Sequence, residues 1–412
     1  MEGAFLSACI RGRIVTQESD VIIVGAGIAG LSLAASLSRQ GLQVVLLEAA
    51  PARPEAVSIG GGLNDWDRRV SALTPASSAL LSEIDVWPDI LTQRSASYHQ
   101  MHVWDGDGTG EITFSANDVD ASELGRIVEN RVTVGALLKR VERDRHITLS
   151  WQDPIAAIKR PNEQVVEVVT ESGKQYAAPL LVGADGVRST VRKQLGFKVR
   201  EWSYEQSAIV ATIALEQAHS DTCYQVFLDS GPLALLPLAD PHVCSIVWSL
   251  DEAQLSAFDS LSDVDFVAAL NRALNGQAPK VSAVGTRAVF PLNQCHAVDY
   301  VQPRVALIAD AAHAIHPLAG QGINLGLADV AVLADEVGRA FCADLDWGEL
   351  AVLSRYQRRR KSDNLAMMAM MEGFKRGFGS QHPALRVLRN MGLKWVDGTA
   401  PLKRWLAAQA LS

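Results

Sequence analysis

The fold is decided near the start of the chain by the stretch Asp20-Val21-Ile22-Ile23-Val24-Gly25-Ala26-Gly27-Ile28-Ala29-Gly30. Its apolar, β-branched run predicts a buried parallel strand, and the residues after the glycines predict a helix that runs to about Gln40. A second apolar strand, Val44 to Leu47, then ends in Glu48. Together these segments predict a βαβ unit, the opening of an α/β fold.

The glycines of this G-x-G-x-x-G pattern each have a physical purpose. Gly25 makes a tight turn, Gly27 lets the backbone approach a pyrophosphate, and Gly30 lets helix and strand pack closely. The helix N-terminus adds N–H donors and a positive dipole. Glu48 follows Gly25 by 23 positions, near the spacing at which a carboxylate accepts hydrogen bonds from an adenosine ribose. The pattern predicts dinucleotide binding without separating FAD from NAD; a glycine-rich loop with no ligand is the simpler alternative.

The composition is that of an ordinary globular enzyme. With 412 residues, 48% hydrophobic and 20% charged, the chain is long enough for two closely joined domains. Its five cysteines are scattered and odd in number, which argues against a disulfide framework or a zinc ribbon and favours a reducing, cytosolic setting. No apolar run is long enough for a membrane span, and no cationic signal peptide precedes the first strand.

Charge is distributed unevenly along the chain. The net charge is −8, yet residues 355–412 hold twelve Lys and Arg against three Asp and Glu. The acidic body argues against nucleic acid as a partner. The basic, methionine-containing C-terminal segment suggests contact with anionic lipid or a partner protein, or alternatively a solvated helical cover over the nucleotide domain.

Beyond the first unit the alternation of strand and helix breaks. Residues 101–116, 205–217 and 222–250 contain β-rich segments with turn residues between them, which predicts an antiparallel sheet that interrupts the nucleotide domain. Residues 305–309 again predict a buried strand, and the pattern is helical from about residue 350.

Three motifs occurring in order give the chain a family resemblance. They are the glycine motif with Glu48, then Gly183-Ala184-Asp185-Gly186-Val187-Arg188-Ser189, and then the stretch from Ala309 to Gly326. Together they resemble the single-component, class A FAD-dependent aromatic hydroxylases. Further segments at 69–73, 127–130, 236–238 and 245–248 are similar to the ubiquinone-biosynthesis hydroxylases. The chain looks closest to the bacterial enzyme for ring carbon 5, and its C-terminal part is also similar to the carbon-6 hydroxylase.

The resemblance implies a GR2 architecture like that of para-hydroxybenzoate hydroxylase. Its FAD-binding Rossmann domain would be discontinuous, over residues 18–95, 124–197 and 286–350. An inserted antiparallel-sheet substrate domain would cover 96–123 and 198–285, and a C-terminal helical segment would cover 351–412. The resemblance also implies an FAD site made of Gly25, Gly27, Gly30, Glu48, Arg69, Asn130, Asp185, Asp310, Pro317, Gly320, Gln321, Gly322 and Asn324.

The implied reaction is hydroxylation of the aromatic ring of a polyprenylated phenol through a flavin C4a-hydroperoxide, at ring carbon 5. It requires FAD, NADPH or NADH as electron donor, and dioxygen, with no metal. The resemblance further implies ubiquinone-biosynthesis proteins as partners and a cytoplasmic location peripheral to the inner membrane face; a homo-oligomer stays open. Two alternatives remain: a hydroxylase of a small soluble phenol, and a weakly active flavin-binding scaffold.

Several residues keep competing interpretations. Asn130 is either a cofactor contact or a helix cap, and Arg188 and Arg192 either meet nicotinamide-cofactor phosphates or lie on a solvated helix face.

His313 and His316 are better explained as structural residues than as acid–base groups, and Tyr224 and Gln225 are guesses for contacts to the substrate hydroxyl. The family usually has glycine where Ala309 stands, so alanine would cost about 1 kcal/mol if φ there is positive.

Overall fold

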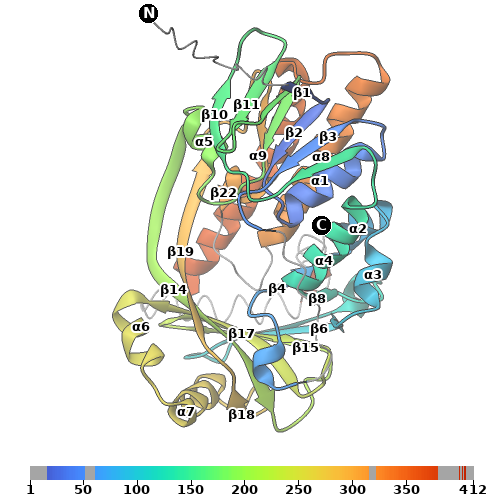
Figure 1. Ribbon diagram of the computed structural model, residues 1–412. Helices are drawn as coiled ribbons and strands as arrows, with labels where there is room; N and C mark the ends of the chain where they lie inside the picture. The colour runs from blue at the N-terminus through green and yellow to red at the C-terminus, as the bar shows by residue number, and fades with distance from the viewer. Residues whose placement is uncertain are drawn as a thin grey trace, which may run out of the picture.

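The computed structural model describes residues 16–51, 61–314, 322–378, 399, 401 and 403–404. Figure 1 shows an upper part built on a parallel sheet and a lower part built on a larger sheet, joined along one side by the long strands β14 and β19. The α/β fold with an interrupting sheet, predicted from sequence, is confirmed.

The upper part is organised by a six-stranded sheet. Its order is β20 (Val301–Gln302), β21 (Val305–Leu307), β13 (Leu180–Gly183), β2 (Val21–Val24), β3 (Val44–Leu47) and β9 (Ile147–Ser150). All pairs are parallel except β20–β21. The predicted first unit is confirmed: β2 runs into α1 (Ile28–Ser38), and every residue of that helix is buried.

Further helices cover this sheet. Helix α8 (Gly322–Cys342) packs on α1, and α9 (Leu350–Phe378) packs on α8. Smaller helices are α2 (Pro75–Glu83), α3 (Trp87–Leu91), α4 (Asn130–Val141) and α5 (Thr190–Gln194). The short η3 turn (Ala309–Ala311) follows β21. Residues 351–378 of the C-terminal segment are therefore helical, as predicted.

Two smaller sheets flank the upper part. One contains β1 (Thr16–Glu18), β12 (Gln175–Ala178), β11 (Val166–Thr170) and β10 (Ile155–Lys159). The other is antiparallel and contains β4 (Val70–Leu73), β8 (Gly125–Glu129) and β5 (Ser95–Tyr98). The short η1 turn (Leu63–Asp65) precedes β4. The three-stranded sheet contacts the lower part through an apolar cluster that includes Ala72, Tyr98 and Leu236.

The lower part is a nine-stranded sheet. Its main path is β22 (His313–Ala314), β19 (Ala288–Ala297), β14 (Val199–Leu215), β17 (Val243–Asp251), β16 (Gly231–Pro237), β15 (Thr222–Leu228), β6 (Gln100–Asp105) and β7 (Glu111–Ser115), with β18 (Val281–Val284) on β14. The sheet is antiparallel except that β6 and β15 run parallel, because β6 arrives from the three-stranded sheet and not from a hairpin with β15. The turn η2 (Ala116–Val119) follows β7.

The two faces of this sheet pack against different partners. Leu235, Ile246 and Trp248 pack on α7 (Asp263–Leu274), which lies on the outer side with α6 (Glu252–Asp259) (Figure 1). Leu236 and Val243, which alternate with them, pack toward the three-stranded sheet. This inner face is the one that adjoins the nucleotide-binding part.

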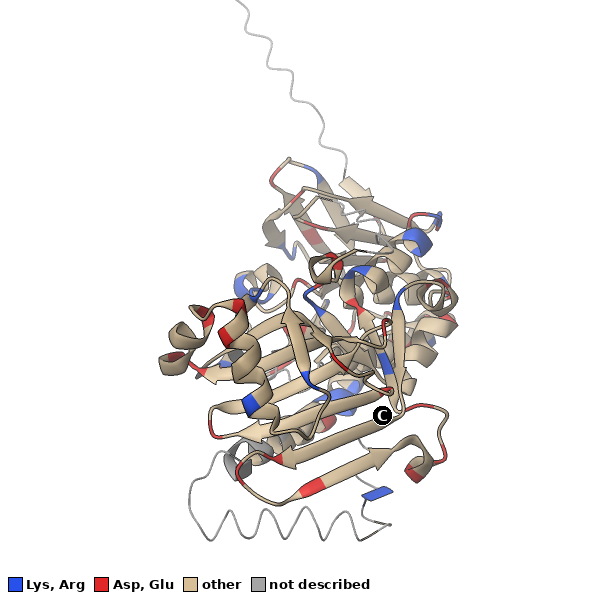
Figure 2. Cartoon of the chain, turned by 90° about the horizontal axis from the view of Figure 1, so that it is seen from below, with Lys and Arg blue, Asp and Glu red and all other residues tan. Residues whose placement is uncertain are grey.

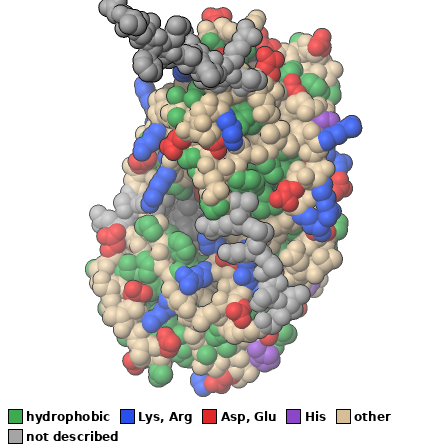
Figure 3. Space-filling view, viewed as in Figure 1, with side chains coloured by type: hydrophobic (Ala, Val, Ile, Leu, Met, Phe, Trp, Pro, Cys, Tyr) green, Lys and Arg blue, Asp and Glu red, His purple; other side chains and the backbone are tan. Residues whose placement is uncertain are grey.

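Charged side chains are spread over the surface. In the view of Figure 2, Lys and Arg are scattered among Asp and Glu, and Figure 3 shows both signs interspersed with apolar patches. Within the described ranges, no helix is both long and apolar enough to cross a membrane.

Candidate active site

The glycine turn after β2 has the geometry that its sequence predicts. Gly25 has φ +106°, and a Cβ there would lie 2.4 Å from the carbonyl oxygen of Ala184. A Cβ on Gly30 would lie 1.9 Å from the carbonyl oxygen of Gly25. A Cβ on Gly27 would meet nothing within 4 Å. Gly25 and Gly30 are thus required by close backbone packing, whereas Gly27 leaves open space at the start of α1.

Glu48 lies beside this turn. Its Oε2 accepts a hydrogen bond from the backbone N–H of Ala26 at 2.7 Å, and its Oε1 accepts one from Ala50 at 2.8 Å. The carboxylate is half-buried and each oxygen keeps a second lone pair. The open space at Gly27, the uncapped start of α1 and this carboxylate fit the pyrophosphate and ribose of a dinucleotide.

Asp185 connects the second motif to the glycine turn, since Ala184 before it touches Gly25. Its Oδ2 accepts hydrogen bonds from the N–H groups of Thr190 at 2.6 Å and Val191 at 3.1 Å, so it caps α5. Its Oδ1 is buried without a hydrogen-bond partner. A buried carboxylate oxygen without a partner is costly, and a ligand donor at this place would satisfy it.

Arg192 has a role that sequence reasoning did not foresee. It is buried, and it donates hydrogen bonds to the carbonyl oxygens of Ala311 at 2.8 Å and Val187 at 2.5 Å. It therefore ties the second motif to the third, and both interpretations offered for it, phosphate contact and solvated helix face, are at odds with this burial. Arg188 is exposed, and its role stays a prediction.

The third motif begins with a strained turn. Ala309 has φ +51°, so the condition under which alanine is costly is met. Its N–H donates to Oδ2 of Asp329 at 3.0 Å, which holds the turn. Asp310 follows with its carboxylate exposed. Desolvation of the carboxylate by the surrounding protein raises the pKa of Asp310, and the positive charges of His313 and Arg69 oppose this rise. Arg69 is exposed and lies just before β4, and its role as a cofactor contact stays a prediction.

The other predicted site residues divide into two groups. Pro317, Gly320 and Gln321, together with His316, lie outside the described residues. Gly322 begins α8, and a Cβ there would meet nothing within 4 Å.

The two asparagines of the predicted site bond to other parts of the protein. Asn324 is buried: its Nδ2 donates to the carbonyl of Ala72 at 2.8 Å, and its Oδ1 accepts from Ser77 Oγ at 2.8 Å. Asn130 is the first residue of α4 and not its cap, and its Oδ1 accepts a hydrogen bond from Ser71 Oγ at 2.6 Å. Both side chains fasten elements around β4.

A buried ionic network supports the Asp310 turn from behind. Asp329 on α8 is fully buried; its Oδ2 accepts from His313 Nε2 at 2.5 Å, and its Oδ1 accepts from Arg360 Nε on α9 at 2.9 Å. Burial alone would raise the pKa of Asp329, but His313 and Arg360 outweigh it and hold the pKa below its usual range. His313 is therefore a satisfied structural residue, as expected.

The network extends into the nine-stranded sheet. Asn364 on α9 accepts a hydrogen bond from Arg360 at 2.8 Å and lies 3.4 Å from the hydroxyl of Tyr300, which contacts His296 Nε2 at 3.0 Å. Burial lowers the pKa of His296 to about 4, and the neighbouring charge of His313 adds to this effect. Strand β22 pairs with β19 through His313 and His296, so the turn is also hydrogen-bonded to the sheet.

Polar side chains without partners lie on the inner face of the nine-stranded sheet. Gln225 and Ser245 are buried, and Gln225 Oε1 and Ser245 Oγ have no hydrogen-bond partner. Their neighbours in sequence, such as Val226 and Ile246, pack on the opposite face. Tyr224 also lies on that opposite face, and its hydroxyl contacts the carbonyl of His219 at 3.4 Å. Of the two residues guessed from sequence, only Gln225 faces inward.

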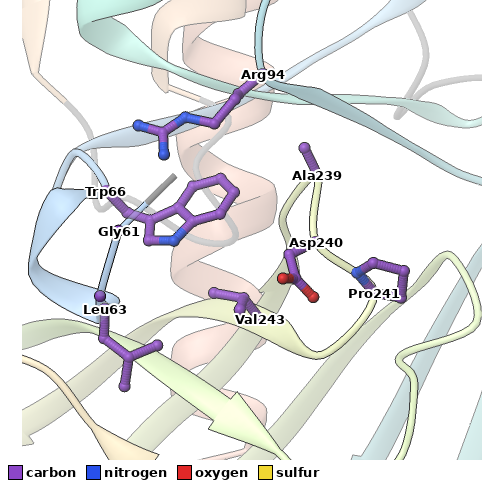
Figure 4. Close-up of a pocket in the computed structure, with 9 residues that line it drawn as sticks. Gly61, Leu63, Trp66, Arg94, Ala239, Asp240, Pro241 and Val243 are labelled. Carbon is purple, nitrogen blue, oxygen red and sulfur yellow. The ribbon is translucent and has the colours of Figure 1, made fainter. Parts of the chain in front are cut away.

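A cavity of about 420 Å³ lies between the η1 segment and the β16–β17 turn. Figure 4 shows the indole of Trp66 at its centre, the guanidinium of Arg94 above it and Asp240 opposite. The guanidinium carbon of Arg94 lies 4.2 Å from the ring centroid of Trp66, and its Nε lies 3.0 Å from Oε2 of the buried Glu129. Sequence reasoning missed this cavity because its walls come from segments far apart in the chain.

Comparisons with known proteins agree with this geometry. Residues 18–370 match the FAD binding domain family. The chain is 34% identical to 3-demethoxyubiquinol 3-hydroxylase of Escherichia coli, over 97% of this chain and 100% of that one. It is 35% identical to the mitochondrial ubiquinone biosynthesis monooxygenase COQ6 of Xenopus tropicalis, over 99% and 98%.

Among solved structures, p-nitrophenol 4-monooxygenase of Pseudomonas putida has the same fold, with a TM-score of 0.75, 18% identity and coverage of 97% and 99% of the two chains. The family match spans most of the chain, and it includes the glycine turn, the Asp185 motif and the Asp310 turn. The chain therefore belongs to the family of FAD-dependent monooxygenases that includes the ubiquinone-biosynthesis hydroxylases.

Proposed function

We propose that this protein hydroxylates the aromatic ring of a polyprenylated phenol on the route to ubiquinone, with FAD, a nicotinamide donor and dioxygen. The observation that carries the proposal is that β22, which follows the Asp310 turn, belongs to the sheet whose buried inner face bears Gln225 and Ser245. One hydrogen-bonded unit thus joins the cofactor side to a water-excluded polar surface. The printed names of the relatives supply the substrate class.

The chain's own residues bind and orient the reactants. The Gly25 turn and Glu48 would hold the pyrophosphate and ribose of FAD, Asp310 would hold its ribityl chain, and Arg69 would favour negative charge on the ring. When bound, FAD supplies the redox chemistry that activates dioxygen. Gln225 Oε1 accepts the hydrogen bond of the substrate's phenol, which increases electron density on the ring, and the burial of this face keeps bulk water away.

Ring carbon 5 stays our prediction for the site of hydroxylation. Lipid extracts of cells that lack the protein should accumulate a prenylated precursor one ring hydroxyl short, and its structure would identify the carbon. The wild-type gene should restore the product. Gln225→Met should restore less than about a tenth of it, because one buried hydrogen bond to the ring is lost, whereas Tyr224→Phe, a change on the opposite face, should restore all of it.

Three results would contradict the proposal. An unchanged lipid profile in the deletion strain would exclude a role in ubiquinone formation. Turnover of small soluble phenols alone by the purified protein would favour the first alternative, a hydroxylase of soluble substrates. FAD binding with no hydroxylated product from any phenol would favour a scaffold.

We also propose that the basic C-terminal segment contacts an anionic membrane surface or a partner biosynthetic protein. The support is its charge, twelve Lys and Arg against three acids over residues 355–412. Deletion from about residue 380 should reduce both flotation with anionic liposomes and recovery of biosynthetic proteins more than FAD content. Equal recovery with and without the segment would remove the proposal.

A further inference from the structure

The cavity between the η1 segment and the β16–β17 turn has two kinds of wall. Leu63 and Trp66 on one side, and Val243 on the other, belong to the same apolar cluster as Leu236 and Ala72. This cluster fills the space between the three-stranded sheet and the inner face of the nine-stranded sheet. The cavity is therefore the outward continuation of the apolar space between the two parts of the molecule.

The cavity also has a short path to the cofactor side. Trp66 lies three residues before Arg69, and both precede β4. Strand β4 follows Arg69 directly, and the carbonyl of its Ala72 accepts the hydrogen bond of Asn324 on α8. Val70 and Ala72 of β4 belong to the same apolar cluster as Trp66 and Leu236, so this strand connects the cavity to the inner sheet face.

The charges in the cavity do not call for a charged ligand. Arg94 is stacked on Trp66 and paired with the buried Glu129, which also accepts from Arg131 at 2.8 Å. The exposed Asp240 accepts from the N–H of His242 at 2.8 Å. A phosphate would have to displace Glu129 from Arg94, whereas an unsaturated hydrocarbon chain packs on the indole and the aliphatic walls without breaking an ion pair.

On these grounds we propose that this cavity binds the isoprene units beyond the first in the tail of the substrate and guides the rest of the chain outward. The inference rests on the proposed function for the identity of the chain. Exposed Gly62, Ala239 and Asp240 border the cavity, so it opens to solvent, where a long chain would continue. The cavity would thus make affinity depend on the length of the substrate's tail.

Two substitutions would fill the cavity from opposite walls at little cost to folding. Gly62 has φ −75° and a Cβ there would meet nothing within 4 Å, so Gly62→Trp introduces no backbone strain. Ala239→Trp acts from the β16–β17 turn, where Ala239 is exposed. The matched control is Gly135→Trp on α4, an exposed position at which a Cβ also meets nothing within 4 Å.

The test compares two prenylated phenols with the same ring, one with a single isoprene unit and one with eight. Gly62→Trp and Ala239→Trp should raise KM for the eight-unit substrate about tenfold or more, because several buried methylene groups lose their contacts. They should leave kcat for both substrates, and KM for the one-unit substrate, within about twofold. Gly135→Trp should match wild type.

A binding experiment separates this inference from the proposed function. Tritiated geranylgeraniol, a prenyl alcohol without an aromatic ring, should bind wild type and the control in equilibrium dialysis, and should bind both filling variants at least tenfold more weakly. If the variants lose geranylgeraniol binding and wild type hydroxylates no substrate, the cavity assignment stands and the proposed function is overturned. If wild type hydroxylates the substrates and KM depends on tail length equally in wild type and all variants, only the cavity assignment is overturned.

Discussion

The pair of neighbouring arginines on α9 allows a stringent test of the network behind the cofactor turn. Both bridge α9 to α8, but the Arg360 side chain is 8% exposed and bonds the fully buried Asp329, whereas the Arg359 side chain is 47% exposed and pairs with Asp335 and Glu336. We compare Arg360→Met with Arg359→Met, since methionine keeps much of the apolar stem and removes the charge.

The structure gives the two changes different magnitudes. Removing one partner of a buried ion pair costs about 3–5 kcal/mol, and because His313 stays bonded to Asp329 we expect the lower end, about 3 kcal/mol. Removing an exposed partner costs about 0–1 kcal/mol, and Glu336 keeps Arg339 at 2.7 Å. For a chain of 412 residues, the expected drop in Tm is roughly 3–4 °C for Arg360→Met and at most about 1 °C for Arg359→Met.

The assay has two readouts on purified protein. Urea unfolding of the FAD-free protein measures the free energy of unfolding, and flavin fluorescence titration measures Kd for FAD. Arg360→Met should also weaken FAD binding, because Asp329 holds the N–H of Ala309 beside Asp310. Arg359→Met should leave Kd unchanged. Equal losses in the two variants would refute the reasoning, since the network would then contribute only helix packing.

Three further predictions concern single residues. Gly27→Val should leave the stability of the FAD-free protein unchanged yet abolish FAD retention, measured by the flavin absorbance of the purified protein, whereas Gly25→Ala should destabilise even the FAD-free protein, because its Cβ would lie 2.4 Å from a carbonyl oxygen. Ala309→Gly should raise the free energy of urea unfolding by about 1 kcal/mol, because φ there is +51°; a loss of stability would show that the alanine is not strained. Burial lowers the pKa of His296 to about 4 from 6.5, so only the unfolded chain takes up this proton between those values. The free energy of unfolding should therefore fall as pH drops from about 6.5 to 4, by at most about 1.4 kcal/mol per pH unit, and His296→Gln should flatten this slope in pH-dependent urea titrations.

Local sequence predicted the glycine turn and its partner acid well. Gly25 and Glu48 belong to one βαβ unit, where strand and helix geometry fix the positions of residues about two dozen apart. The sequence also allowed a conditional prediction at Ala309. Because the family usually has glycine at this position, the backbone there could require a positive φ, at which alanine is strained.

The buried network could not be predicted in the same way. Asp329, His313 and Arg360 come from α8, β22 and α9, and nothing in their spacing shows that these elements meet. An isolated aspartate in an amphipathic helix is ordinarily a surface residue. Gln225 and Tyr224 show the same limit at shorter range, because the alternation of a strand indicates that they face opposite ways but not which of the two faces inward.

The pairing of β22 with β19 has a consequence for how the reactants are spaced. The backbone just after Asp310 is an edge strand of the sheet that bears Gln225, and main-chain hydrogen bonds over the five strand pairs from β22 to β15 connect the two. We expect substitutions that shift this whole sheet to move the Asp310 turn and Gln225 together. Regioselectivity should consequently be robust to changes at the periphery of the sheet and sensitive to side-chain volume on its inner face.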